Sequence, residues 1–207
     1  MITYLKGKLL KKEEDRIVVL VNGVGYDVRL PYIVRQTYKR KKAGQDGEEV
    51  ELFVSYQQSE RQPKPLLIGF NFEVEREFFE KFIEVEDIGP IKAVRALTMP
   101  IPKIARAIEE RDVKTLKTLN GIGARTAEKV VASLNGKVGK FALMREDMIK
   151  IPEEPEDLKR QVQEVLVKQL GHKQSEANRM VNEAIKRKPD ISTAEELFEE
   201  VYRGQRT

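Results

Sequence analysis

The middle of the chain contains the same apolar pattern twice, with matching positions 34 residues apart. In the second copy two apolar segments flank Gly121-Ile122-Gly123, and in the first copy Asp87-Ile88-Gly89 takes the same place. The apolar positions around the turns also correspond: Phe82 and Leu116, Val85 and Leu119, Ala93 and Ala127, and Ala96-Leu97 and Val130-Val131. A fixed period of this kind indicates one supersecondary unit used twice. The pattern predicts two helical hairpins, each with a tight turn around an inward-pointing isoleucine.

Each turn has the features of a phosphate-binding site. Glycine allows backbone angles that are closed to other residues and leaves no side chain between the amide groups and a ligand. The unpaired N–H groups and the positive dipole end of the following helix then face the same point, which suits a phosphate. This is the helix-hairpin-helix signature, and it predicts binding to nucleic-acid backbone without sequence readout. A simple helix stop is the alternative for one copy alone, but two copies in register argue against it.

The two copies differ at one position that matters for an anion. Asp87 stands where the second copy has Gly121. Aspartate tolerates left-handed backbone angles better than most residues, but its charge opposes an incoming phosphate. We therefore predict that the second hairpin binds more strongly. The predicted DNA contacts are Ile88, Gly89, Ile91 and Lys92 in the first copy, and Gly121, Ile122, Gly123, Ala124, Arg125, Thr126 and Lys129 in the second.

Charge is distributed unevenly around the hairpins. Residues 71–89 hold seven acidic and two basic side chains, a net charge of −5, whereas residues 90–137 hold ten basic and four acidic side chains, a net charge of +6. The basic block covers most of the repeat, as expected for a phosphate-binding surface. The whole chain has a net charge of only +4, so this prediction depends on the local excess.

The hairpins lie between two segments of different character, so the predicted fold class is α+β. Residues 1–70 alternate apolar and polar positions in five short runs, with Asn22-Gly23 as a two-residue hairpin turn between the second and the third. Five short antiparallel strands in so few residues favour a small closed barrel such as an OB-fold. The runs cover residues 2–9, 16–21, 25–30, 50–56 and 65–70.

After the barrel, we expect a tandem hairpin domain at residues 71–136, a linker at 137–156 and a three-helix unit at 157–207. The hairpin helices are expected at residues 73–85, from Pro90, and at 102–111, 113–119 and 124–134. The linker has scattered glycine and proline without a sustained period, although residues 141–144 are apolar enough to dock. The terminal unit contains amphipathic stretches at 157–170, 175–186 and 193–202 and is nearly neutral. This favours a protein-docking role over a second DNA contact.

Composition excludes several kinds of chemistry. The chain has no cysteine, which excludes disulfides and thiolate metal sites, and His172 is the only histidine. No Walker phosphate-binding loop occurs, and Glu84, Glu86 and Asp87 would lie on different helix faces. We expect no catalytic residue, metal or cofactor. Because no run of about 18 apolar residues exists, we also expect a soluble, cytoplasmic protein. The chain is therefore predicted to be a binding scaffold.

The order of these segments resembles the RuvA family, the junction-binding subunits of bacterial branch-migration complexes. The resemblance covers essentially the full chain and is carried by residues 22–28 (NGVGYDV), 67–70 (LIGF), 121–129 (GIGARTAEK) and 170–181 (LGHKQSEANRMV). It implies a scaffold that holds four-way junction DNA in an open square form for branch migration in recombination and repair. It also implies a homotetramer, or an octamer when a second tetramer closes over the DNA. The terminal unit would be UBA-like and dock a hexameric RuvB-type ATPase through Leu166, Leu170 and His172.

The chain departs from the family pattern at three places. In such proteins an acidic pair at a barrel turn forms a central pin that repels phosphates, whereas here Glu60 remains and Arg61 replaces the second acid. Ala124 replaces a customary lysine, and Asp87 a customary glycine. These changes imply a divergent member with differently tuned junction opening.

Two other functions stay open from the residues themselves. One is a monomeric helix-hairpin-helix adaptor that recruits another repair enzyme, and the other is a nuclease subunit that uses the acids at residues 84–87. At the terminal unit, Leu170 could equally be a core residue that precedes a helix stop at Gly171. Solution mass separates scaffold from adaptor, since only the scaffold requires fourfold assembly.

Overall fold

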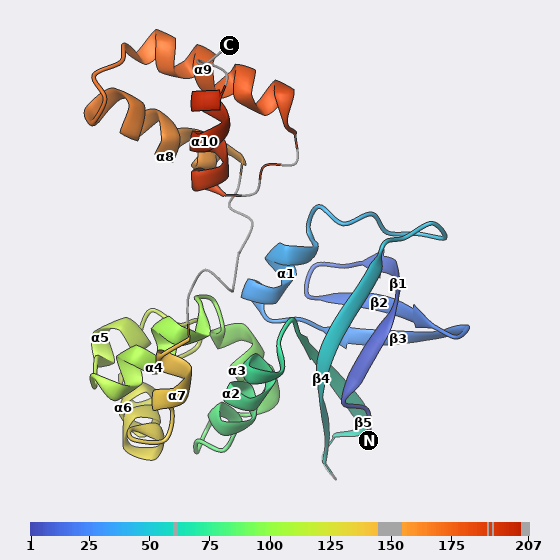
Figure 1. The fold of residues 1–207 in the computed structure, drawn as a ribbon. Coiled ribbons are helices and arrows are strands. Elements are labelled where there is room, and N and C mark those ends of the chain that lie inside the picture. Colours follow the sequence, from blue (N-terminus) through green and yellow to red (C-terminus); the bar gives the residue numbers. More distant parts are fainter. Residues whose placement is uncertain (60–61, 145–154, 190, 192, 204–207) are drawn as a thin grey trace. The chain divides into compact units, whose positions relative to one another are not determined.

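The computed structural model describes residues 1–59, 62–144, 155–189, 191 and 193–203. It divides into two compact units, Met1–Ile149 and Lys150–Thr207 (Figure 1). No helix within the described residues has both the length and the apolarity needed to cross a membrane. The first unit contains the barrel and the hairpins, and the second contains the C-terminal helices, which confirms the α+β class.

The N-terminal part is a closed barrel with the strand order β1-β2-β3-β5-β4. Neighbouring strands are antiparallel except β3 and β5, which are parallel. The turn between β2 and β3 places Asn22 at φ 50° and Gly23 at φ 85°, the left-handed angles that an Asn-Gly hairpin requires. The five-stranded barrel is thus confirmed. Its strands are β1 (Tyr4–Lys12), β2 (Arg16–Val21), β3 (Val24–Arg29), β4 (Glu49–Ser59) and β5 (Gln62–Phe70).

A short helix that the sequence pattern did not predict lies between β3 and β4. This helix, α1, spans Tyr32–Tyr38 and buries Ile33, Val34 and Tyr38. The Tyr38 hydroxyl donates a hydrogen bond of 3.0 Å to the carbonyl oxygen of Glu51 on β4, so α1 is tied to the barrel. A helix of seven residues completes only about two turns, which is too short for a clear apolar period.

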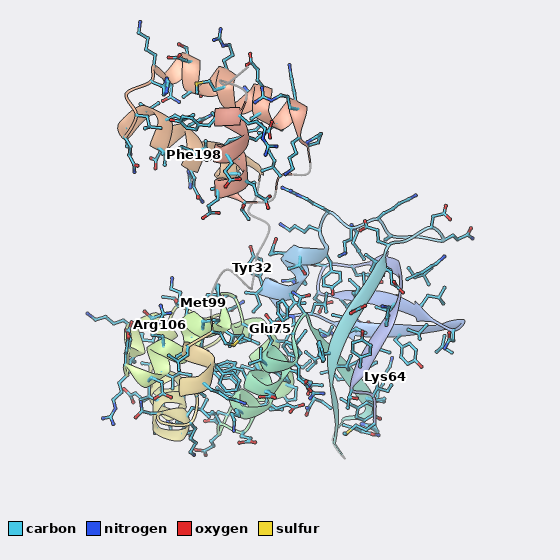
Figure 2. All side chains as sticks on the ribbon, in the orientation of Figure 1. Tyr32, Lys64, Glu75, Met99, Arg106 and Phe198 are labelled. Atoms are coloured by element: carbon cyan, nitrogen blue, oxygen red, sulfur yellow. The ribbon has the colours of Figure 1, made fainter. Side chains whose placement is uncertain are left out.

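The hairpin part packs directly against the barrel within the first unit. Helix α2 contacts both β4 and β5, and the ring of Phe79 lies 5.2 Å from the ring of Phe70 at the end of β5. Glu75, in the first turn of α2, is buried where the helix meets the barrel (Figure 2). The helices are α2 (Glu73–Ile83), α3 (Pro90–Ala96), α4 (Ile101–Glu109), α5 (Val113–Leu116), α6 (Ala124–Leu134) and α7 (Gly139–Ala142).

Helix α7 corrects the predicted linker at residues 137–156. It packs on α4, and Phe141 is fully buried with its ring 5.3 Å from Phe78 in an edge-to-face arrangement. The Glu109 carboxylate accepts hydrogen bonds from the N–H groups of Gly136 and Val138, at 2.8 and 3.0 Å. Residues 137–142 therefore belong to the hairpin domain. A four-residue helix has no period that a sequence pattern could reveal, and residues 145–154 lie outside the described part of the chain.

The second unit consists of three helices around one apolar core, close to the predicted stretches. They are α8 (Pro155–Lys168), α9 (Gln174–Arg187) and α10 (Ala194–Arg203). The buried core residues are Leu158, Val162, Leu166, Ala177, Met180, Val181, Ala184, Ile191, Leu197 and Val201. On α10, Phe198 packs against this core and lies 5.0 Å from the Tyr202 ring (Figure 2).

Candidate nucleic-acid interface

The two hairpin turns have the same construction. Ile88 and Ile122 are only 2% and 4% exposed. Their N–H groups donate 3.0 Å hydrogen bonds to the carbonyl oxygens of Val85 and Leu119, respectively, each three positions earlier. Gly89 and Gly123 then precede α3 and α6 with nearly identical extended backbone angles, φ −82° and ψ 169° against φ −83° and ψ 176°. The predicted repeat of a turn around an inward isoleucine is confirmed. Ile88 and Ile122 therefore support the turns from inside.

The start of α6 presents free backbone donors. Within the described residues no side chain caps Gly123, and a Cβ added to Gly123 would meet no atom within 4 Å. The N–H groups of the first turn, which include those of Ala124 and Arg125, have no partner inside a helix and lie at its positive dipole end. Helix α3 begins with Pro90, which lacks an N–H. The second hairpin thus offers one donor more than the first.

Asp87 adopts the backbone conformation expected of its glycine counterpart. Its φ is 68°, against 79° for Gly121, so the aspartate fits the left-handed turn. Its charge, however, is already paired, since the Lys129 ammonium lies 2.5 Å from Asp87 Oδ2 and 2.9 Å from Glu86 Oε2. The hydrogen bond to Lys129 lowers the pKa of the Asp87 carboxyl, and the two carboxylates raise the pKa of Lys129.

This ion pair changes the role of a predicted DNA contact. Lys129 was expected to meet phosphate, but in the structure it binds two carboxylates of the first hairpin turn. The sequence could not show this, because the partners are 42 residues apart. Ala124 and Arg125 are exposed as expected, and no ion pair to Arg125 is formed by the residues that the structure describes.

The two turns meet in one surface hollow of about 560 Å³. Lys92 spans it, because its ammonium donates hydrogen bonds to the Asp87 carbonyl at 3.2 Å and to the Thr126 hydroxyl at 3.5 Å. Both partners are neutral oxygens, and among the described residues no carboxylate lies within ion-pair distance of the Lys92 ammonium, although its charge helps to lower the pKa of Asp87. Arg95 and Asn120 also line the hollow and were missed. The repeat could have identified Arg95, which stands 34 residues before Lys129. The full lining is Gly89, Pro90, Ile91, Lys92, Arg95, Asn120 and Gly121.

The remaining predicted contacts lie elsewhere. Glu60 and Arg61 of the expected pin lie outside the described residues; the residues on either side, Ser59 and Gln62, are paired on β4 and β5.

In the second unit Leu166 is fully buried in the core, so its prediction as a partner-binding residue is wrong. An apolar residue on the inner face of α8 cannot be told from a docking residue by type alone.

The turn that follows α8 is exposed. Leu170 is 45% exposed, Gly171 has φ 73°, and the His172 Nδ1 lies 3.3 Å from the Glu176 carboxylate. The alternative in which Leu170 is a core residue is therefore excluded. Gly171 does end the helix with a left-handed angle.

Comparison with known proteins agrees with this architecture. A model of the RuvA N terminal domain matches residues 1–64, and a model of the SAM-like helix-hairpin-helix tandem matches residues 79–135. A protein of Desulfatibacillum aliphaticivorans is 52% identical over 99% of both chains, and one of Desulfosudis oleivorans is 48% identical over 98% of both. A protein of Rhodopirellula baltica is 34% identical over 98% of both. Each is named Holliday junction branch migration complex subunit RuvA. Identity of this extent over the full length shows that the chain belongs to the RuvA family.

Proposed function

We propose that the chain is the DNA-binding subunit of a branch-migration complex and that it binds four-way (Holliday) junction DNA through the backbone. The observation that carries the proposal is the pair of matched turns, with uncapped donors at α6 and three cations, Lys92, Arg95 and Arg125, close to them. Main-chain donors and cations recognise phosphates without reading bases. The names of the full-length relatives support the same function.

We further propose that four copies act together on one junction. One pair of hairpin turns meets the backbone of one duplex arm, so a junction with four arms needs four copies to be held open and square. A homotetramer satisfies this requirement, and a second tetramer closing over the other face would make an octamer. Glu60 and Arg61 would then act as the pin residues, and because their opposite charges cancel in each copy, the pin would change how the junction is opened rather than whether it is held.

For the terminal unit, we propose docking of a hexameric RuvB-type ATPase. The exposed Leu170 and the adjoining His172 support this role, because they form a partly apolar surface at a helix end. The ATPase would supply the work of moving the arms, and the chain itself would carry no catalytic residue. In this scheme residues 1–70 and 71–142 form the DNA-binding part, residues 157–207 form the motor-docking part, and the complex works with the DNA in the cytoplasm.

The test compares a four-way junction with duplex DNA of equal length. Fluorescence anisotropy at fixed salt gives the two affinities, and mass photometry gives the number of protein copies on the DNA. We expect tighter binding to the junction and complexes that contain four or eight copies. A complex of one copy without a preference for the junction would contradict the proposal and support the monomeric adaptor.

A pair of variants on α6 tests whether the second turn makes the contact. Gly123→Asp places a carboxylate before the uncapped N–H groups, so we expect at least tenfold weaker junction binding. Ala132→Asp adds the same charge at an exposed position near the other end of α6, and we expect a much smaller loss. Circular dichroism of both variants checks that the helices remain folded. Equal losses in the two variants would exclude the turn as the phosphate contact.

A further inference from the structure

Because of the repeat, each position at one turn has an equivalent position at the other turn, 34 residues away in the sequence. At a spacing of 34 residues, Lys129 corresponds to Arg95, and the acidic pair Glu86-Asp87 corresponds to Asn120-Gly121. The contact between the first turn and α6 therefore has a cation and two acids, whereas the contact between the second turn and α3 has a cation and no acid. Two nearly equivalent environments can thus be compared within the same molecule.

In the first environment the cation is already bound. Lys129 lies 2.9 Å from Glu86 and 2.5 Å from Asp87, and its side chain is only 22% exposed. The contact joins α6 of the second hairpin to the turn of the first. A phosphate that approached Lys129 would have to displace one carboxylate and would remain close to both negative charges, which repel it.

In the second environment the cation is free. Arg95 is exposed and lines the hollow together with Asn120 and Gly121, neither of which carries a charge. Among the residues that the structure describes, no carboxylate forms an ion pair with Arg95. Lys92 lines the same hollow and bonds only neutral oxygens. The hollow therefore contains two cations that need not give up an acidic partner.

We propose that Arg95, together with Lys92 and Arg125, binds phosphate at the turns in place of Lys129, and that Lys129 is a positioning residue, held by Glu86 and Asp87 as a tie between the two turns. A guanidinium binds phosphate oxygens through two parallel hydrogen bonds, and Arg95 does so without breaking an internal ion pair. The inference rests on the proposed junction binding and assigns its charge to a different residue from the one that the hairpin pattern suggests.

The experiment measures junction affinity against salt concentration for the full-length chain. Each phosphate contact that is lost flattens the slope of log affinity against log salt by about 0.9. For Arg95→Ala we expect a slope that is flatter by about that amount for each copy bound, and binding that is several-fold weaker. Arg95→Lys keeps the charge, so it should keep the slope while it loses some affinity. An unchanged slope in Arg95→Ala would overturn the proposal.

Lys129 is tested with its acidic partners neutralised, because Lys129→Met alone would leave two carboxylates facing the DNA. The double variant Glu86→Gln, Asp87→Asn frees Lys129, and we expect tighter binding and a steeper slope. Adding Lys129→Met should return the slope to that of the wild type. A triple variant with a slope as flat as that of Arg95→Ala would show that Lys129 already binds phosphate in the wild type, which would overturn the proposal. Failure of the wild type to bind the junction would instead contradict the proposed function itself.

Discussion

The first turn of α2 contains a buried carboxylate that should make the stability of the first unit depend on pH. Glu75 is fully buried where α2 meets the barrel (Figure 2). Its Oε2 accepts hydrogen bonds from the N–H groups of Asn71 and Phe72, at 3.0 and 3.2 Å. Its Oε1 is buried and has no partner among the described residues. Burial raises the pKa of Glu75 to about 7, although the two backbone hydrogen bonds oppose the rise.

The direction of the effect follows from the direction of the pKa shift. In the unfolded chain the pKa has its ordinary value of 4.5, so the folded protein binds the proton more tightly. The contribution to stability is therefore complete below pH 4.5, is lost as the pH rises towards 7, and is absent above that. A pKa raised from 4.5 to about 7 corresponds to about 3 kcal/mol of unfolding free energy. Most of this falls between pH 5 and pH 8.

The perturbation is Glu75→Gln, which keeps a side-chain oxygen for the two N–H groups and removes the titration. Urea unfolding of the full chain at pH 5 and pH 8, followed by tyrosine fluorescence, reports mainly on the first unit, which has five of the six tyrosines. We expect the wild type to lose about 2–3 kcal/mol more than the variant between these pH values. Glu84→Gln, at an exposed position at the end of α2, should behave like the wild type. The same pH dependence in wild type and Glu75→Gln would refute the reasoning.

Three further changes test the core packing and the assignment of DNA binding and motor docking to different units. Phe141→Ala should destabilise the first unit by about 3–5 kcal/mol because it empties a fully buried site, whereas Leu143→Ala, at a residue that is 86% exposed, should change the unfolding midpoint in urea very little. Gly7→Ala should lower the melting temperature of the barrel, because its Cβ would lie 2.3 Å from the Leu20 carbonyl oxygen; an unchanged melting curve would contradict this packing. Deletion of residues 150–207 should leave junction affinity within a few-fold and abolish ATP-driven branch migration with the motor, and a loss of junction binding would contradict the assigned roles.

Features encoded by neighbouring residues could be predicted from the sequence. The Asn22-Gly23 turn and the bounds of α6 at Ala124–Leu134 agree with expectation, because turn chemistry and apolar period act within a few residues. Helices α1 and α7, of seven and four residues, are too short to show a period, and unlike the equally short α3 and α5 they lie outside the 34-residue repeat that revealed those helices. Their helical state is fixed by buried side chains such as Tyr38 and Phe141, whose partners are distant in sequence.

The location of the two turns could be predicted from the sequence, but which of their charges remain unpaired could not. The repeat located both turns, and the inward isoleucines and uncapped glycines lie as expected. The pairing of Lys129 with Glu86 and Asp87 was not predictable, because it joins the basic block to the acidic block across 42 residues. Counting charges along the chain separates the acidic block at 71–89 from the basic block at 90–137, whereas folding brings Lys129 of the basic block onto Glu86 and Asp87 of the acidic block.

The neutralisation of Lys129 by Glu86 and Asp87 limits the number of phosphate contacts that one copy can make. At the turns, the cations without an ion pair to any described residue are Lys92, Arg95 and Arg125. If each contacts one phosphate, the slope of log affinity against log salt is about −2.7 for one copy and about −11 for four copies bound as a unit. Joint binding also multiplies weak individual affinities, because each later contact forms at a high effective concentration. A measured slope near −11 with a four-way junction would show that fourfold assembly compensates for the neutralised Lys129. A slope near −3 would mean that a single copy binds by itself.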